Sequence, residues 1–212
     1  MTGALVNGRV LTDAGVLVAA GHTDASAATI FAALDHGLRG FTHLFNAMST
    51  LGAREPGTVG AALHDSRGWM GIIVDGRHVD PVTLRLALRA SPIERFMLVT
   101  DAMPSVGAAD KAFRLQGRAI RVDNGACVDA AGTLAGSDLD MAGAVRNCVD
   151  LLGLDLATAV AMASRHPAAF LGLDGELGRI APGYRASLVL ADDALQVLET
   201  WIDGVPAGAL RP

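Results

Sequence analysis

Four short apolar runs, each ending at or near a residue that can do chemistry, constrain this 212-residue chain more than any other feature. The first run ends at His22, the second at His43 and the fourth at Asp101. The third ends at Asp75, with His78 just beyond it. Each run is bounded by glycine or polar residues, which favours buried strands over helices. The chain is therefore expected to place its reactive residues where strands end.

The segments between the runs carry the signals of helices. One helix is expected to end at Gly37, and its cap is one of Thr23, Asp24 and Ser26. The Asp-Pro pair at 80–81 predicts another helix start. Strands that alternate with helices pair in parallel through right-handed crossovers. In a (β/α)8 barrel the catalytic residues lie at the C-terminal ends of the strands, and four such units make half of that barrel.

Beyond Asp101 the pattern changes to shorter strands and then to helices. Residues 113–129 are expected to form short strands around turns at Gly117 and Asn124, which predicts a β-hairpin insertion. The remaining expected elements are two helices and then a pair of strands, at 138–152, 155–163, 186–191 and 198–204. The strand pair is typical of a small β appendage.

Charge, hydropathy and cysteine content argue against several classes of protein. The net charge is −5 and no basic stripe is present, so nucleic acid is not an expected partner. No stretch approaches the roughly 20 apolar residues of a membrane span, and the first ten residues do not resemble a signal peptide. Cys127 and Cys148 lack CxxC spacing and are expected to be buried thiols in a reducing compartment. We therefore expect a cytoplasmic α/β protein with no membrane partner.

The strand-end residues have the chemistry of a metal-assisted amide hydrolase. His22 and His43, at the ends of adjacent parallel strands, can converge on one cation, and imidazole suits zinc or iron. Asp101 can take a proton from water and give it to a leaving amine, while His78 can polarise the carbonyl under attack. From spacing alone a plainer interpretation stays open: strand-end histidines can simply satisfy backbone groups, and Asp101 can cap a helix.

Short sequence words add a resemblance to a known family. The words are GHTDA (21–25), THLFNAM (42–48), REPG (54–57), DGRHV (75–79), TDAM (100–103), GTLAGS (132–137) and LGRIAPG (177–183). In this order they resemble the C-terminal part of N-acetylglucosamine-6-phosphate deacetylases, over essentially the whole chain. THLFNAM followed by REPG is the most specific feature. The resemblance implies hydrolysis of N-acetylglucosamine 6-phosphate to glucosamine 6-phosphate and acetate.

The resemblance also implies roles for individual residues. His22 and His43 match ligands of a divalent metal, zinc or else iron, Asp101 matches the catalytic acid and base, and His78 matches the group that binds the acetamido carbonyl. Arg54 matches a phosphate contact that reaches across a dimer interface, which implies a homodimer. The other residues that match substrate contacts are Asn46, Ala47, Leu134, Ala135 and Gly136, of which the last three match a loop whose backbone lies against the substrate.

The family pattern also implies a fold, and it includes one metal ligand that has no match in this sequence. The resemblance predicts the last four units of a partial (β/α)8 barrel over residues 1–170, and strands of a small β-sandwich domain over 171–212. In the family, a glutamate on an earlier strand completes the metal site, and nothing here maps onto it; Glu55 lies inside the REPG word and is not a substitute. Two alternatives follow: a non-catalytic or incomplete fragment that needs a complementing chain, or an amidohydrolase for another N-acyl substrate.

Overall fold

The computed structural model describes residues 3–210 as an α/β structure built around a parallel sheet. Its four strands follow one another in chain order and are β1 (Val18–Ala20), β2 (Leu38–Phe41), β3 (Trp69–Ile72) and β4 (Phe96–Leu98). All neighbouring strands are parallel. Each strand lies in one of the four apolar runs, so the predicted α/β class with a parallel sheet is confirmed.

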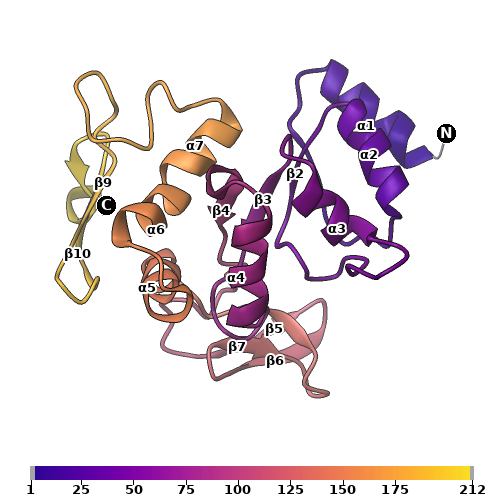
Figure 1. Cartoon of the computed structure of the whole chain (residues 1–212). Helices are drawn as coiled ribbons and strands as arrows, with labels where there is room; N and C mark the ends of the chain where they lie inside the picture. The colour runs from indigo at the N-terminus through magenta and orange to yellow at the C-terminus, as the bar shows by residue number, and fades with distance from the viewer. Residues whose placement is uncertain (1–2, 211–212) are drawn as a thin grey trace.

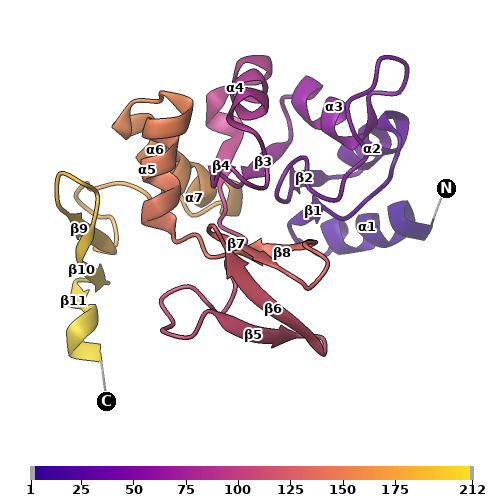
Figure 2. The same ribbon diagram turned by 90° about the horizontal axis from the view of Figure 1, so that it is seen from below.

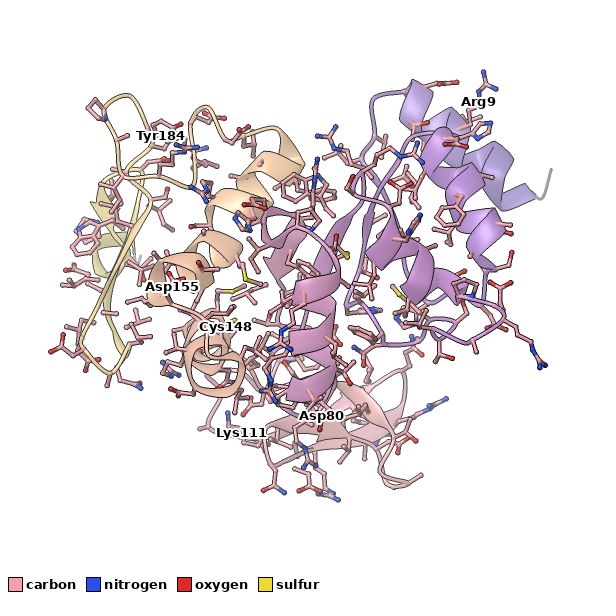
Figure 3. The ribbon with its side chains drawn as sticks, viewed as in Figure 1. Arg9, Asp80, Lys111, Cys148, Asp155 and Tyr184 are labelled. Carbon is pink, nitrogen blue, oxygen red and sulfur yellow. The ribbon has the colours of Figure 1, made fainter. Side chains whose placement is uncertain are left out.

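Three α-helices connect these strands, and two of them, those that begin at Ala27 and Pro81, start where the sequence provides a capping side chain. They are α2 (Ala27–Asp35), α3 (Gly57–His64) and α4 (Pro81–Ala90), with a short 3-10 helix, η1 (Ile93–Arg95), before β4. The Thr29 N–H donates to Ser26 Oγ at the start of α2. The Val82 N–H donates to Asp80 at the start of α4 (Figure 3). Both starts are as predicted, because a side chain that accepts the free N–H groups of the first turn is a local signal.

Three α-helices in the described part of the chain, α1 (Gly3–Asp13), α3 and α7 (Arg165–Leu171), were not predicted from the sequence. Helix α1 precedes the first strand, and α3 follows the loop after β2. Pro56, which precedes α3, provides no side-chain hydrogen bond to cap it. Six residues of α3 are buried, so packing against the rest of the fold stabilises this helix rather than a local cap.

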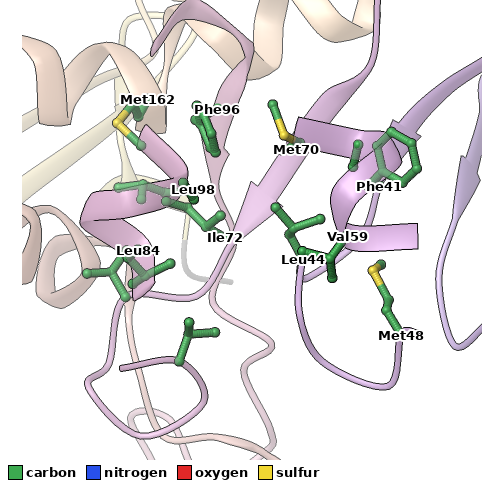
Figure 4. Close-up of a cluster of buried hydrophobic side chains, with 14 of the residues drawn as sticks. Phe41, Leu44, Met48, Val59, Met70, Ile72, Leu84, Phe96, Leu98 and Met162 are labelled. Atoms are coloured by element: carbon green, nitrogen blue, oxygen red, sulfur yellow. The ribbon is translucent and has the colours of Figure 1, made fainter. Parts of the chain in front are cut away.

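The core lies between the parallel sheet and its helices (Figure 4). Strand side chains in it include Phe41, Met70, Ile72, Phe96 and Leu98, and helix side chains include Val59, Leu84 and Met162. Each of these is at most 3% exposed. Burial of one such side chain stabilises the fold by about 1.5–3 kcal/mol. The aliphatic core therefore holds the strand ends, and the reactive residues beyond them, in fixed positions.

A four-stranded antiparallel sheet replaces the simple hairpin expected near 113–129. Its strands are β5 (Ala112–Leu115), β6 (Arg118–Asp123), β7 (Ala126–Val128) and β8 (Leu134–Ser137). The predicted turns are present: Gln116 and Gly117 join β5 to β6, and Asn124 and Gly125 join β6 to β7, all with positive φ. Residues Leu134–Gly136 thus lie in a strand, not in the expected loop, because they pair with β7.

The rest of the chain is helical and ends in a small sheet. The helices are α5 (Met141–Leu152), α6 (Leu156–Ala163) and α7 (Arg165–Leu171), and they are followed by β9 (Leu188–Ala191), β10 (Val197–Ile202), β11 (Val205–Pro206) and a 3-10 helix, η2 (Ala207–Leu210). Strands β9 and β10 are antiparallel, as predicted. They lie at the opposite end of the molecule from α1 in both views (Figures 1 and 2).

Two further expectations concern the helices and the thiols. None of the helices in the described part of the chain is long and apolar enough to cross a membrane. Cys127 and Cys148 are both free and buried, as predicted. Burial raises the pKa of the Cys148 thiol to about 12, so this thiol is protonated at neutral pH and acts as a packing group.

Candidate active site

The parallel order of the sheet brings four reactive residues to one edge. His22 follows β1, His43 follows β2, His78 lies beyond β3 and Asp101 follows β4. Because the strands are parallel and adjacent in the order β1-β2-β3-β4, their C-terminal ends meet along the same edge of the sheet. Sequence alone predicts this grouping, since each residue is tied to the end of its own strand.

His22 and His43 lie against each other. Their ring centroids are 4.8 Å apart and the rings are nearly perpendicular, with 78° between their planes. His43 Nδ1 is buried and has no hydrogen-bond partner among the described groups. A buried polar atom without a partner costs free energy, so a ligand for this nitrogen would stabilise the site. Two imidazoles, one of them with a free buried nitrogen, fit a divalent cation.

A third protein ligand for a cation is not found within residues 3–210. No cluster of three or more His, Cys, Asp or Glu side chains there has the geometry to hold a metal. Glu55 is already engaged: its Oε1 accepts the Ala27 N–H at 2.8 Å and the Gly57 N–H at 3.0 Å. These backbone hydrogen bonds lower the pKa of the Glu55 carboxyl. Its role in this structure is to join α2 to the start of α3, as a structural residue.

Strained backbone concentrates at the same edge. Positive φ angles occur at five non-glycine residues there, with 46° at His22, 24° at His43, 81° at Phe45, 49° at Ala47 and 52° at Asp101. The left-handed region is uncommon for such residues and persists only where surrounding structure imposes it. Strain of this kind clusters at functional sites, and here it marks both predicted metal ligands and the predicted acid and base.

The loop after β2 is tied to the loop after β1. The Thr23 N–H donates to Ala47 O and the Ser49 N–H donates to Thr23 O, both at 3.0 Å. The Asn46 side-chain amide donates to His43 O at 3.3 Å and to Leu44 O at 3.4 Å. These bonds fix the shape of the loop that carries His43 and leave the Asn46 amide oxygen without a donor among the described residues.

His78 is held from behind by Asp75. Nδ1 of His78 lies 2.6 Å from Asp75 Oδ2, and the two side chains are 3% and 4% exposed. Burial by itself would raise the pKa of the Asp75 carboxyl, but hydrogen bonds from the His78 ring and from the His78 and Arg77 N–H groups hold that pKa below its ordinary value. Asp75 is thus a charged partner of His78. The sequence carries its signal, an Asp three residues before a His, but the same spacing also fits a simple turn.

Asp101 faces His78 and is backed by β8. Its Oδ2 lies 3.9 Å from His78 Nε2, and its side chain is 43% exposed. The Ser137 N–H donates to Asp101 O at 2.8 Å, and the Met103 N–H donates to Ser137 O at 2.9 Å. Strand β8 therefore supports the segment that carries Asp101. A cavity of about 240 Å³ opens beside it, and its lining includes His43 and Asp101.

The other residues predicted to contact substrate are less tightly grouped. Arg54 is exposed and makes no hydrogen bond or ion pair with the described residues. Leu134 and Ala135 line a separate small hollow with side chains of β5 and β6. Gly136 is buried beside the Asp101 segment, since a Cβ built on it would lie 2.9 Å from Asp101 O. Of this β8 group, the backbone at Gly136 comes nearest to the strand-end residues.

Comparisons with known proteins fit this arrangement. Residues 10–207 match the family described as the amidohydrolase family. This chain belongs to the amidohydrolase family. The N-acetylgalactosamine-6-phosphate deacetylase of Escherichia coli O157:H7 is 44% identical to it over 202 residues, which make up 95% of this chain and 53% of that protein.

Solved structures of amino-sugar phosphate deacetylases have the same fold as this amidohydrolase chain. The N-acetylglucosamine-6-phosphate deacetylase of Pasteurella multocida superposes with a TM-score of 0.92 at 33% identity, over 96% of this chain and 54% of that one. A variant of the Mycobacterium smegmatis enzyme, in complex with N-acetyl-D-glucosamine-6-phosphate, gives a TM-score of 0.89 at 39% identity, over 96% of this chain and 54% of that one. The chain spans about half the length of these relatives.

Proposed function

We propose that this chain contributes to a site that hydrolyses the acetamide of N-acetylglucosamine 6-phosphate, releasing acetate and glucosamine 6-phosphate. The observation that carries the proposal is the meeting of His22, His43 and Asp101, with His78 behind them, at one edge of the parallel sheet. The names of the relatives support the substrate class, which is a phosphorylated amino sugar.

A divalent cation, zinc or iron, fits between His22 and His43. Their perpendicular rings and the free buried Nδ1 of His43 support this assignment. When bound, such a cation lowers the pKa of a coordinated water towards neutrality.

The chain's own residues then divide the remaining chemistry. Asp101 takes the proton of the attacking water as its oxygen bonds to the acetyl carbon, and returns that proton to the amine when the C–N bond breaks. His78 donates from Nε2 to the acetyl oxygen, where negative charge develops. The 3.9 Å between His78 Nε2 and Asp101 Oδ2 lets the two groups act on the same acyl group from neighbouring positions.

The phosphate and sugar are assigned to the loops around this centre. Arg54 is exposed and unpaired among the described residues, so its guanidinium is available for a phosphate through two parallel hydrogen bonds. Asn46 and Ala47, on the loop after β2, are proposed to help bind the phosphate. The backbone of Leu134, Ala135 and Gly136 is proposed to lie against the sugar. A homodimer in which Arg54 serves the partner's site belongs to the same proposal.

The proposed architecture rests on the likeness to the solved deacetylase structures. Residues 1–170 are assigned to the last four units of a (β/α)8 barrel, with the antiparallel strands as an insertion, and residues 171–212 to strands of a small β-sandwich domain. Residues 1–2 and 211–212 of these ranges lie outside the described part of the chain. The parallel order of β1 to β4 and the exposed apolar side chains of β9 and β10 support this assignment.

Two alternatives have specific support. The Escherichia coli relative, named for the galactosamine epimer, is 44% identical, against 39% for the Mycobacterium smegmatis enzyme, which favours N-acetylgalactosamine 6-phosphate as a second candidate substrate. The lack of a third metal ligand within residues 3–210 favours a site that is completed by another polypeptide.

Acetate release tests the proposal. The purified chain with added zinc is given N-acetylglucosamine 6-phosphate, N-acetylgalactosamine 6-phosphate and unphosphorylated N-acetylglucosamine in parallel. We expect release from the phosphorylated sugars only, and the faster of the two identifies the substrate. Equal release from the unphosphorylated sugar would overturn the phosphate assignment. No release from a folded chain would favour the incomplete site.

A further inference from the structure

Asp75, the buried partner of His78, has no assigned role in the chemistry described above. Both side chains are almost completely buried, at 4% and 3% exposed, and they are joined by the 2.6 Å contact between Oδ2 and Nδ1. Isolated buried charges are costly. A pair of this kind beside an exposed aspartate therefore needs an explanation.

The Asp75 carboxylate is fixed by contacts on both oxygens. Its Oδ1 accepts the N–H groups of Arg77 and His78, each at 2.8 Å, while Oδ2 receives the ring of His78. The turn around it is tight, with Gly76 at φ 68°. Asp75 therefore cannot rotate without losing several hydrogen bonds, and it presents one oxygen to His78 in a constant direction.

This geometry determines where His78 carries its proton. A charged carboxylate can only accept hydrogen bonds, so Nδ1 must carry the hydrogen that lies between the two groups. The opposite nitrogen, Nε2, is then directed towards Asp101, 3.9 Å away. When the ring carries a proton on each nitrogen, Nε2 donates to a carbonyl oxygen.

We propose that Asp75 is a positioning residue, whose carboxylate fixes the tautomer and the orientation of His78 so that Nε2 faces the acyl group beside Asp101. The catalytic meaning of this inference rests on the proposed function, but the placement of the proton does not. The segment just before Asp75 is fixed as well. The Asn147 side-chain amide donates to Val74 O at 2.7 Å, which holds the residue before Asp75 against α5.

The first test reads the proton directly in the unmodified chain. Nitrogen-15 labelling of the histidines and long-range proton–nitrogen NMR spectra report which ring nitrogen is protonated, and a His78→Gln sample assigns the signal among the six histidines. We expect a static His78 ring with a hydrogen-bonded proton on Nδ1. A ring with a bare Nδ1 and a proton on Nε2, or a ring that averages between orientations, would overturn the proposal whether or not the chain is active.

The second test removes the charge. Asp75→Asn is compared with Asp80→Asn, a matched change a few residues away, where the carboxylate only caps α4 and asparagine caps equally well. We expect Asp75→Asn to lose the Nδ1 proton signal of His78 and to lower kcat for acetate release by about 10- to 100-fold, with KM nearly unchanged. The Asp80→Asn control is expected to retain both. An Asp75→Asn chain that keeps the wild-type ring signal contradicts the proposal.

Discussion

At the scale of residues, the carboxylates of Asp75 and Glu55 each hold neighbouring groups in place through hydrogen bonds. His22, His43 and Asp101 can be predicted from the sequence, because each follows a short apolar run whose end marks the end of a strand. The pairing of Asp75 with His78 depends on burial of both side chains, and three-residue spacing does not specify that burial. The same holds for Glu55, whose carboxylate reaches an N–H group 28 residues earlier in the chain.

Another histidine gives a prediction about pH and stability. His166 is 4% exposed, and its Nδ1 lies 2.8 Å from Phe96 O, which ties α7 to β4. Burial lowers the pKa of His166 in the folded chain below its ordinary value. Above pH 6.5, which is about the pKa of a histidine in the unfolded chain, the ring is neutral in both the folded and the unfolded chain, and His166 does not lower the free energy of unfolding. Below that pH the unfolded chain takes up a proton first, so the free energy of unfolding falls by at most about 1.4 kcal/mol per pH unit.

Denaturant unfolding at pH 7.5 and pH 5.5 measures this effect. The wild-type chain is expected to lose stability at the lower pH, and a His166→Gln variant is expected to lose less. An unchanged pH dependence in His166→Gln would show that this ring does not titrate between the two states.

At the scale of elements, helix starts and turns were predicted from local signals, whereas a strand whose position depends on pairing was not. The caps at Ser26 and Asp80 and the turns at Gly117 and Asn124 lie within a few residues of the groups that they serve. Strand β8 has no such signal, because its place is set by pairing with β7 and by bonds to the Asp101 segment. Because of this pairing, Leu134–Gly136 form a strand where a loop was expected.

A glycine in β8 tests that contact. Gly136 has φ 107°, and an added Cβ would lie 2.5 Å from Met103 Cγ and 2.9 Å from Asp101 O. Gly132 also has a positive φ, of 82°, but nothing lies within 4 Å of its added Cβ. We expect Gly136→Ala to cost about 1–3 kcal/mol more in free energy of unfolding than Gly132→Ala, measured by denaturant unfolding. It should also slow acetate release, because β8 must move away from the Asp101 segment. Equal costs for the two variants would contradict the close packing.

At the scale of the whole molecule, the chain brings its reactive residues to one edge of a four-stranded sheet and spans about half the length of its relatives. The sheet contains four parallel strands within residues 3–210, and the cation site proposed there has two histidines. The relatives are about twice as long as the chain. Residues contributed by another polypeptide could not be predicted from this sequence, because a partner's contribution leaves no local signal in the chain.

The most direct test of the central claim compares acetate release by the wild-type chain and by Asp101→Asn, with N-acetylglucosamine 6-phosphate and the same zinc concentration. The Asp101 side chain is 43% exposed, so the variant is expected to fold like the wild type, as checked by circular dichroism. The account predicts measurable release by the wild type and a loss of about 10²- to 10⁴-fold in the variant. No release from the folded wild-type chain, or equal release from both, would contradict a hydrolytic site at these strand ends.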